Sequence, residues 1–73
     1  EGDILVIDRA LDPKDGDMAV CFVDGEFTLK HLRIEDGGLR LEPANPKYPA
    51  IEITEGVEFR MWGVVTYIIK KVR

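Results

Sequence analysis

The chain has 73 residues, of which one is a cysteine and one a histidine, so it is one small domain without an intrachain disulfide or a zinc cluster. Its net charge of −4 argues against direct DNA binding, and its longest apolar run, residues 61–69, is far shorter than the about 20 residues of a membrane-spanning helix. We therefore expect a cytoplasmic protein without a metal or a cofactor, because an unpaired cysteine suits a reducing compartment.

Short apolar segments separated by turn signals predict an all-β fold. Residues 4–7 and 18–23 are continuous apolar runs, which are typical of strands buried on both faces. In the next segment, residues 26–34, Phe27 and Leu29 alternate with polar residues. Further strands are predicted at residues 39–42, 51–53 and 59–72, and the last of these is apolar on both faces in its middle. The pattern indicates about six mostly antiparallel strands.

The clearest local signal is Asp24-Gly25, which stands between two apolar runs. A two-residue type I′ turn needs positive φ angles at both positions, and Asp and Gly tolerate them. The dipeptide therefore predicts a tight hairpin that joins two antiparallel neighbours.

The strand after this hairpin changes its apolar face. Under strict alternation Phe27 and Leu29 share one face, whereas Leu32 and Ile34 lie on the other. A β-bulge at the switch would restore one inward face. Without a bulge, Lys30 shares a face with Leu32 and Ile34. In both cases we expect Lys30 to be partly desolvated.

Desolvation changes what a lysine amine can do. An ordinary lysine has a pKa near about 10.4, so only about one molecule in a few thousand is neutral at pH 7. Apolar surroundings disfavour the ammonium form, and a neutral amine can accept the proton of a serine hydroxyl. This is the Ser–Lys form of nucleophilic catalysis. From the spacing alone, Lys30 can equally be a solvated strand lysine whose stem lies along the sheet.

The remaining chemically active side chains have structural explanations. Cys21 lies in an apolar run and is expected to be a small buried hydrophobe. We expect His31 at the surface or at a sheet edge. Trp62 and Tyr67 are interpreted as core or interface residues and not as a platform for stacking bases.

Three segments resemble the UmuD and LexA family of self-cleaving proteins. Residues 23–32, Val-Asp-Gly-Glu-Phe-Thr-Leu-Lys-His-Leu, look like the family's hairpin and lysine strand, residues 41–48 are similar to its "L-x-P-x-N" connection, and residues 62–69 look like its last strand. The resemblance covers nearly the whole chain. It implies a small, strongly twisted β-fold, places residues 1–73 in the C-terminal peptidase-like domain, and assigns the general base to Lys30.

The chain contains no serine, which departs from the family pattern. Family members place the nucleophilic serine upstream of a Gly-Asp pair that precedes a strand, and Gly2-Asp3 resembles that pair. We therefore expect the serine and the cleavage site to precede Glu1. None of the threonines matches the nucleophile position. Residues 1–73 alone are then expected to be inactive, while their parent is a serine peptidase.

The resemblance also implies partners and a role. The UmuD branch is the nearer likeness, which implies self-cleavage stimulated by a RecA filament on single-stranded DNA. A homodimer would then assist a Y-family polymerase in error-prone synthesis during the SOS response. The small size of the domain is consistent with a dimer, for which the last strand is a candidate interface. The alternatives are the C-terminal self-cleaving domain of a LexA-like or phage-type repressor, and a non-enzymatic β-module for protein interaction.

Overall fold

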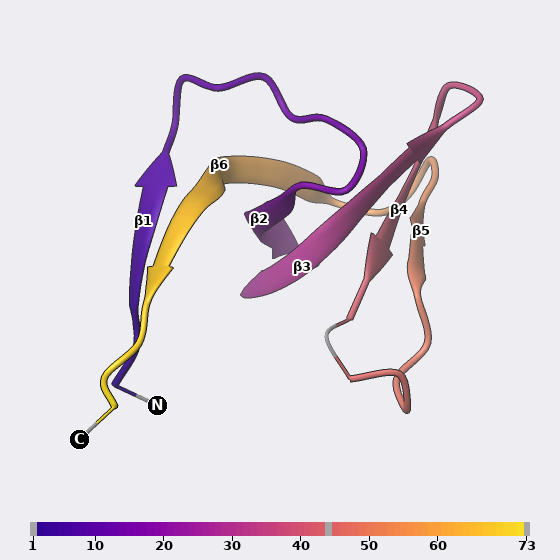
Figure 1. The fold of residues 1–73 in the computed structure, drawn as a ribbon. Helices are drawn as coiled ribbons and strands as arrows, with labels where there is room; N and C mark the ends of the chain where they lie inside the picture. The colour runs from indigo at the N-terminus through magenta and orange to yellow at the C-terminus, as the bar shows by residue number, and fades with distance from the viewer. Residues whose placement is uncertain (1, 44, 73) are drawn as a thin grey trace.

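The computed structural model describes residues 2–43 and 45–72, so Glu1, Arg73 and Ala44 of the proline-rich connection lie outside the described residues. Six strands form one antiparallel sheet in the order β1-β6-β2-β3-β4-β5, which confirms the predicted all-β fold (Figure 1). The strands are β1 (Ile4–Asp8), β2 (Met18–Val23), β3 (Glu26–Glu35), β4 (Gly38–Glu42), β5 (Ile51–Ile53) and β6 (Phe59–Ile69). Within residues 2–43 and 45–72, no helix is long and apolar enough to cross a membrane.

The hairpin between β2 and β3 is the turn expected from the sequence. Asp24 and Gly25 have φ angles of 45° and 91°, as a type I′ turn requires. Asp24 also holds a distant segment, because its backbone N–H donates to the Glu58 carbonyl at 2.9 Å and its Oδ1 accepts from the Glu58 N–H at 3.1 Å. The hairpin therefore fixes the place where β6 begins.

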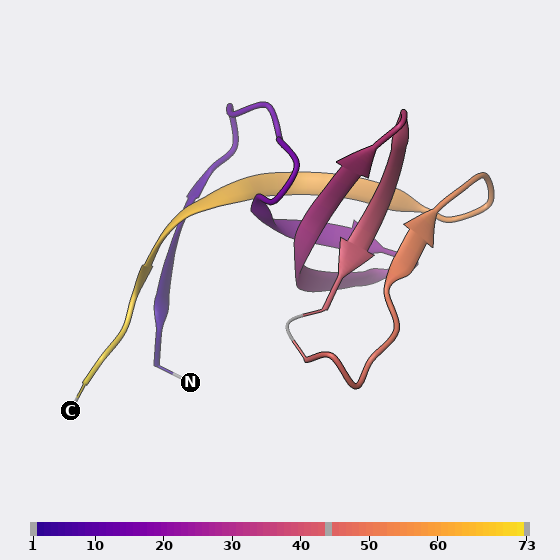
Figure 2. The same cartoon turned by 45° about the vertical axis from the view of Figure 1, so that its right-hand side comes forward.

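The sheet curls strongly, and its concave face holds the core. In Figure 2, β3, β4 and β5 turn away from the plane of β2 and β6. The buried residues of the core cluster are Ala19, Cys21, Leu32 and Leu41, with Val23, Leu39, Ile51, Ile53, Phe59 and Met61 packed around them. Within the described residues, one curled sheet thus encloses its own core.

The other end of the sheet is a two-stranded ribbon made of β1 and the C-terminal half of β6, with Ile4 opposite Ile69. The expectation that residues 4–7 are buried on both faces was wrong, because Ile4 is 60% and Val6 40% exposed. β1 is an edge strand, and among the described strands it pairs with β6 alone. Consecutive residues of β6 in the ribbon are also exposed, and Tyr67, at 70% exposure, is not a core residue of this chain.

β6 spans both parts of the molecule and contains two irregularities of register. Trp62 is the extra residue opposite β2, where Cys21 pairs with Met61 and Val20 pairs with Gly63. Thr66 is the extra residue opposite β1, between Tyr67 and Val65. Such bulges bend a strand and increase its twist. They explain how one strand of 11 residues can be part of the curled sheet at its start and of the two-stranded ribbon at its end.

Candidate functional site

Lys30 lies on the concave face of the sheet. The register between β2 and β3 is unbroken, so β3 has no bulge and the second of the two expected arrangements is correct. Lys30 therefore shares a face with buried Leu32. Phe27 and Leu29 lie on the opposite, convex face and are 64% and 38% exposed.

The neighbours of Lys30 on this face are small or apolar. Lys30 pairs with Ala19, which in turn pairs with Val64 of β6, so these residues form one row across three strands. Ala19 is fully buried and Val64 is 4% exposed, while Lys30 itself is half-buried. In the part of the chain that the structure describes, no carboxylate forms an ion pair with the Lys30 amine. The amine thus lies at the rim of an apolar core without a fixed counter-charge.

The pKa of the Cys21 thiol reflects both the burial of this face and the charge of Lys30. Cys21 is fully buried, and this burial raises the pKa of the Cys21 thiol above its ordinary value, while the nearby charge of Lys30 acts in the opposite direction. The Sγ of Cys21 is directed at the Ala19 carbonyl, 3.8 Å away. The prediction that Cys21 is a small buried hydrophobe is confirmed, and a reactive thiol is not expected here.

The strand that carries Lys30 has an open edge beside it. β4 pairs with β3 only from His31 onward, so no strand among the described residues lies along the first half of β3 on that side. The backbone N–H of Leu32 donates to Asp17 on the β2 side. In an antiparallel sheet, consecutive residues of a strand direct their backbone N–H and C=O groups to opposite sides. Since Leu32 faces β2, the N–H and C=O groups of Phe27 and Leu29 point to the open edge. This edge can accept an extended peptide as a further strand.

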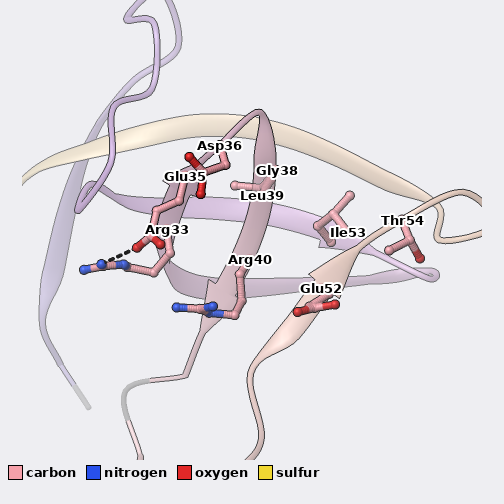
Figure 3. Close-up of a pocket in the computed structure, with 9 residues that line it drawn as sticks. All are labelled: Arg33, Glu35, Asp36, Gly38, Leu39, Arg40, Glu52, Ile53 and Thr54. Carbon is pink, nitrogen blue, oxygen red and sulfur yellow. Dashed lines mark hydrogen bonds and ion pairs between the residues drawn. The ribbon is translucent and has the colours of Figure 1, made fainter.

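A second feature, the pocket in Figure 3, lies at the other end of β3 and β4. Its nine lining residues are Arg33, Glu35, Asp36, Gly38, Leu39, Arg40, Glu52, Ile53 and Thr54, and Lys30 is not among them. Arg33 donates to Glu35 at 2.6 Å and lies 3.6 Å from Asp15, while Arg40 lies 3.4 Å from Glu42. The hydrogen bond to Glu35, assisted by the charge of Asp15, raises the pKa of Arg33. We interpret this pocket as a network of paired surface charges.

The same network connects the loop before β2 to β3, and no sequence pattern predicts it. Asp15 Oδ1 accepts a hydrogen bond from the Ile34 N–H at 2.8 Å, across 19 positions of sequence. Such a contact depends on the tertiary fold and has no local pattern. His31 lies half-buried between Met18 and Glu42 in the cross-strand register, and we assign it no chemical role. In the residues that the structure covers, no group of three His, Cys, Asp or Glu side chains is placed to hold a metal ion.

Lys30 and the start of the chain lie in different parts of the fold. The row that contains Lys30, Ala19 and Val64 ends at Asp8, the last residue of β1. Ile4, the first residue of β1, pairs with Ile69, the last residue of β6, at the tip of the ribbon (Figure 1). Gly2 and Asp3 are therefore separated from Lys30 by the length of β1.

Comparison with known proteins identifies relatives over almost the whole chain. Residues 1–66 match the family described as Peptidase S24-like. The chain is 40% identical to Protein SamA of Salmonella typhimurium, over 99% of the chain and 49% of that protein. It is 37% identical to Protein ImpA of Salmonella typhimurium, over 99% of the chain and 48% of the relative. LexA repressor 1 of Xanthomonas campestris pv. campestris is 34% identical, over 97% of the chain and 35% of the repressor.

The chain thus spans about half the length of SamA and ImpA and about a third of the LexA repressor. The family match includes the hairpin and the lysine strand, residues 23–32. The chain therefore belongs to the Peptidase S24-like family, the family of UmuD and LexA to which its sequence pointed.

Proposed function

We propose that residues 1–73 supply the general base of a self-cleaving serine peptidase that acts in the SOS response. The base is Lys30, and the nucleophilic serine is supplied by a segment upstream of Gly2. The observation that carries the proposal is the position of Lys30, half-buried beside Ala19 and Val64 and, within residues 2–43 and 45–72, without a paired carboxylate. A lysine amine is the base in the Ser–Lys form of nucleophilic catalysis, and here it projects from the same face as the apolar core.

In the proposed reaction the serine hydroxyl transfers its proton to the Lys30 amine while its oxygen attacks the carbonyl carbon of a peptide bond. The resulting ammonium then gives the proton to the departing amine nitrogen, and a water molecule later releases the acyl group from the serine. Lys30 returns to its neutral form at the end of the cycle. Residues 1–73 alone provide this base but no serine nucleophile.

The open edge of β3 provides a place for the peptide that is cut. An extended segment that pairs with Phe27 and Leu29 would run past Lys30, within the same strand. Backbone hydrogen bonds would hold the peptide with little dependence on its side chains. The cleaved segment of the same protein, brought there by its tether, is the natural occupant.

The fold also limits where the serine can lie. A segment upstream of Gly2 starts near the tip of the ribbon and must return along β1 to reach Lys30. β1 has 5 residues, which span about 17 Å at about 3.4 Å per residue. We therefore propose that at least about five residues separate the serine from Gly2.

We further propose a UmuD-like role for the parent protein. Contact with a RecA filament on single-stranded DNA would stimulate cleavage, and a homodimer would then assist a Y-family polymerase. The higher identity to SamA and ImpA than to LexA repressor 1 supports this choice. The alternative is a LexA-like repressor, which would carry a helix-turn-helix domain upstream. The sequence of the upstream segment decides between them.

The direct test is Lys30→Ala in the full-length parent, incubated with activated RecA filament. Self-cleavage, followed by gel electrophoresis, is expected to fall at least about 100-fold, the usual range for loss of general base catalysis. Lys47→Ala, which removes an exposed lysine from a loop, is the matched control and should cleave normally. Normal cleavage by a folded Lys30→Ala protein would show that Lys30 is not the general base.

A further inference from the structure

We propose that a pocket on the convex face of the sheet binds an acidic peptide segment of a partner protein. This convex pocket is lined by Phe22, Phe27 and Trp62, with Arg9 and Arg60 beside them. It lies on the side of the sheet opposite Lys30, because Phe27 and Lys30 have opposite parity on β3. The proposal is therefore independent of the peptidase function.

The apolar floor of the convex pocket comes from adjacent strands. Phe22 of β2 pairs with Phe27 of β3 on one side and with Arg60 of β6 on the other. The two phenylalanine rings meet edge to face, with centroids 5.2 Å apart and planes at 71°. Although paired, Phe27 remains 64% exposed, and Trp62 next to Arg60 is 38% exposed. Exposed aromatic side chains gathered in this way are typical of binding surfaces.

Arg9 is held in a fixed position over this floor. Its Nε donates to the Trp62 carbonyl at 3.1 Å, and its guanidinium carbon lies 4.4 Å from the centre of the Trp62 ring. Gly63 makes room for it, since a Cβ at that position would lie 3.3 Å from the Arg9 Cγ. The stacking and the hydrogen bond leave the two terminal nitrogens of Arg9 available to a ligand. An arginine ordered in advance loses less entropy when it binds a carboxylate.

Charge complementarity identifies the occupant. Over the two described ranges, neither Arg9 nor Arg60 forms an ion pair, whereas Arg33 and Arg40 do. Two unpaired guanidinium groups beside an aromatic floor fit carboxylates on either side of an apolar side chain. A nucleic acid fits less well, because the chain as a whole carries a charge of −4 and repels a phosphate backbone. The surface therefore suits a peptide with acidic residues around an aromatic or aliphatic one.

The test uses fluorescein-labelled Glu-Asp-Leu-Phe-Asp and its neutral counterpart Gln-Asn-Leu-Phe-Asn, titrated with the purified protein and followed by anisotropy. We expect the acidic peptide to bind and the neutral peptide to bind at least about tenfold more weakly. Arg9→Gln and Arg60→Gln should each weaken binding of the acidic peptide by about tenfold. Lys47→Gln removes the same charge from an exposed loop and should leave the affinity unchanged.

Each variant is checked for its fold by near-ultraviolet circular dichroism, and a labelled oligothymidine is titrated in parallel. The proposal is overturned if the two peptides bind equally, or if neither binds. It is also overturned if Lys47→Gln weakens binding as much as the two arginine variants do. Tighter binding of oligothymidine than of the acidic peptide would replace the proposed partner with single-stranded nucleic acid.

Discussion

The curled part of the sheet and the ribbon are made from similar apolar residues but bury them to very different extents. In the curled part, Leu32 and Leu41 are 1% and 0% exposed, whereas in the ribbon Ile4 and Ile69 are 60% and 54% exposed. Both pairs face each other across neighbouring antiparallel strands. The difference arises because β2 to β5 curl over one another, while the ribbon has only two strands.

This contrast shows that apolar composition alone does not decide burial in a small β-domain. A strand pair needs a further layer over its face, and an isolated two-stranded pair is only marginally stable in water. The curled sheet supplies that layer for itself. In the ribbon the apolar side chains remain available, which fits our proposal of a homodimer with the last strand, β6, as its candidate interface.

The largest expected effect separates the two regions directly. Leu41→Ala should lower the free energy of unfolding by about 2–5 kcal/mol, because it leaves a cavity in the core. Ile4→Ala, at 60% exposure, should cost about 0.5 kcal/mol or less in the monomer. Urea unfolding followed by circular dichroism measures both.

Equal costs for the two substitutions at low protein concentration would contradict the contrast. If the loss of unfolding free energy caused by Ile4→Ala grows with protein concentration, the contrast between the two regions becomes sharper. The reason is that a dimer stabilises the fold by mass action, so a contact made by Ile4 in the dimer counts more at high concentration. That result would place the second copy on the ribbon.

The junction between the two regions is tested by Gly63→Ala. A Cβ on Gly63 would collide with Ile7 Cγ2 and approach the Asp8 carbonyl to 3.3 Å, so the Ile7 side chain or the β1 backbone must shift. Overpacking of this kind costs about 1–3 kcal/mol. Hydrogen exchange should show faster exchange of the β1 and ribbon amides and little change in β3 and β4. Uniform loss of protection in all strands would indicate that the ribbon and the curled part unfold as one unit.

A smaller effect is expected at alkaline pH in the curled part. Burial raises the pKa of Cys21 above its ordinary value of 9.0, so the folded state holds the thiol proton more tightly than the unfolded state. The resulting stabilisation is complete below pH 9.0 and is lost as the pH rises through the folded-state pKa. Cys21→Ala should be less stable at neutral pH but should lose less stability between neutral and alkaline pH. An identical pH dependence in both proteins would show that the thiol is not desolvated.

The smallest predicted effect concerns the position of the Lys30 charge. Lys30→Met should raise the pKa of Cys21 further, since the positive charge of Lys30 opposes the effect of burial. The thiolate absorbance near 240 nm, titrated in both proteins, measures the shift. An unchanged Cys21 pKa would mean that the Lys30 amine points away from the concave face.

The sequence predicted the local elements well because their signals are local. Asp24-Gly25 needs only its own φ angles to define a hairpin, and the strands β2 and β5 begin and end where predicted. The exposure of Ile4 and the contact between Asp15 and Ile34 depend on which strands become neighbours, so no local pattern encodes them. For the site, the alternation of apolar residues was compatible with β3 either with or without a bulge near Lys30. The unbroken register between β2 and β3 shows that there is no bulge.

The extra residue at Trp62 has a consequence for redesign. Before it, Met61 faces the core with Cys21, and after it Val64 does so with Ala19, an odd spacing that only a bulge allows. Deleting Trp62 would leave Met61, Gly63 and Val64 paired with Cys21, Val20 and Ala19 in a regular ladder, so the pairing would survive but the bend and the extra twist of the bulge would be lost, and with them part of the curl. Loop engineering or chimera building with a relative must therefore preserve the count of residues between Met61 and Val64.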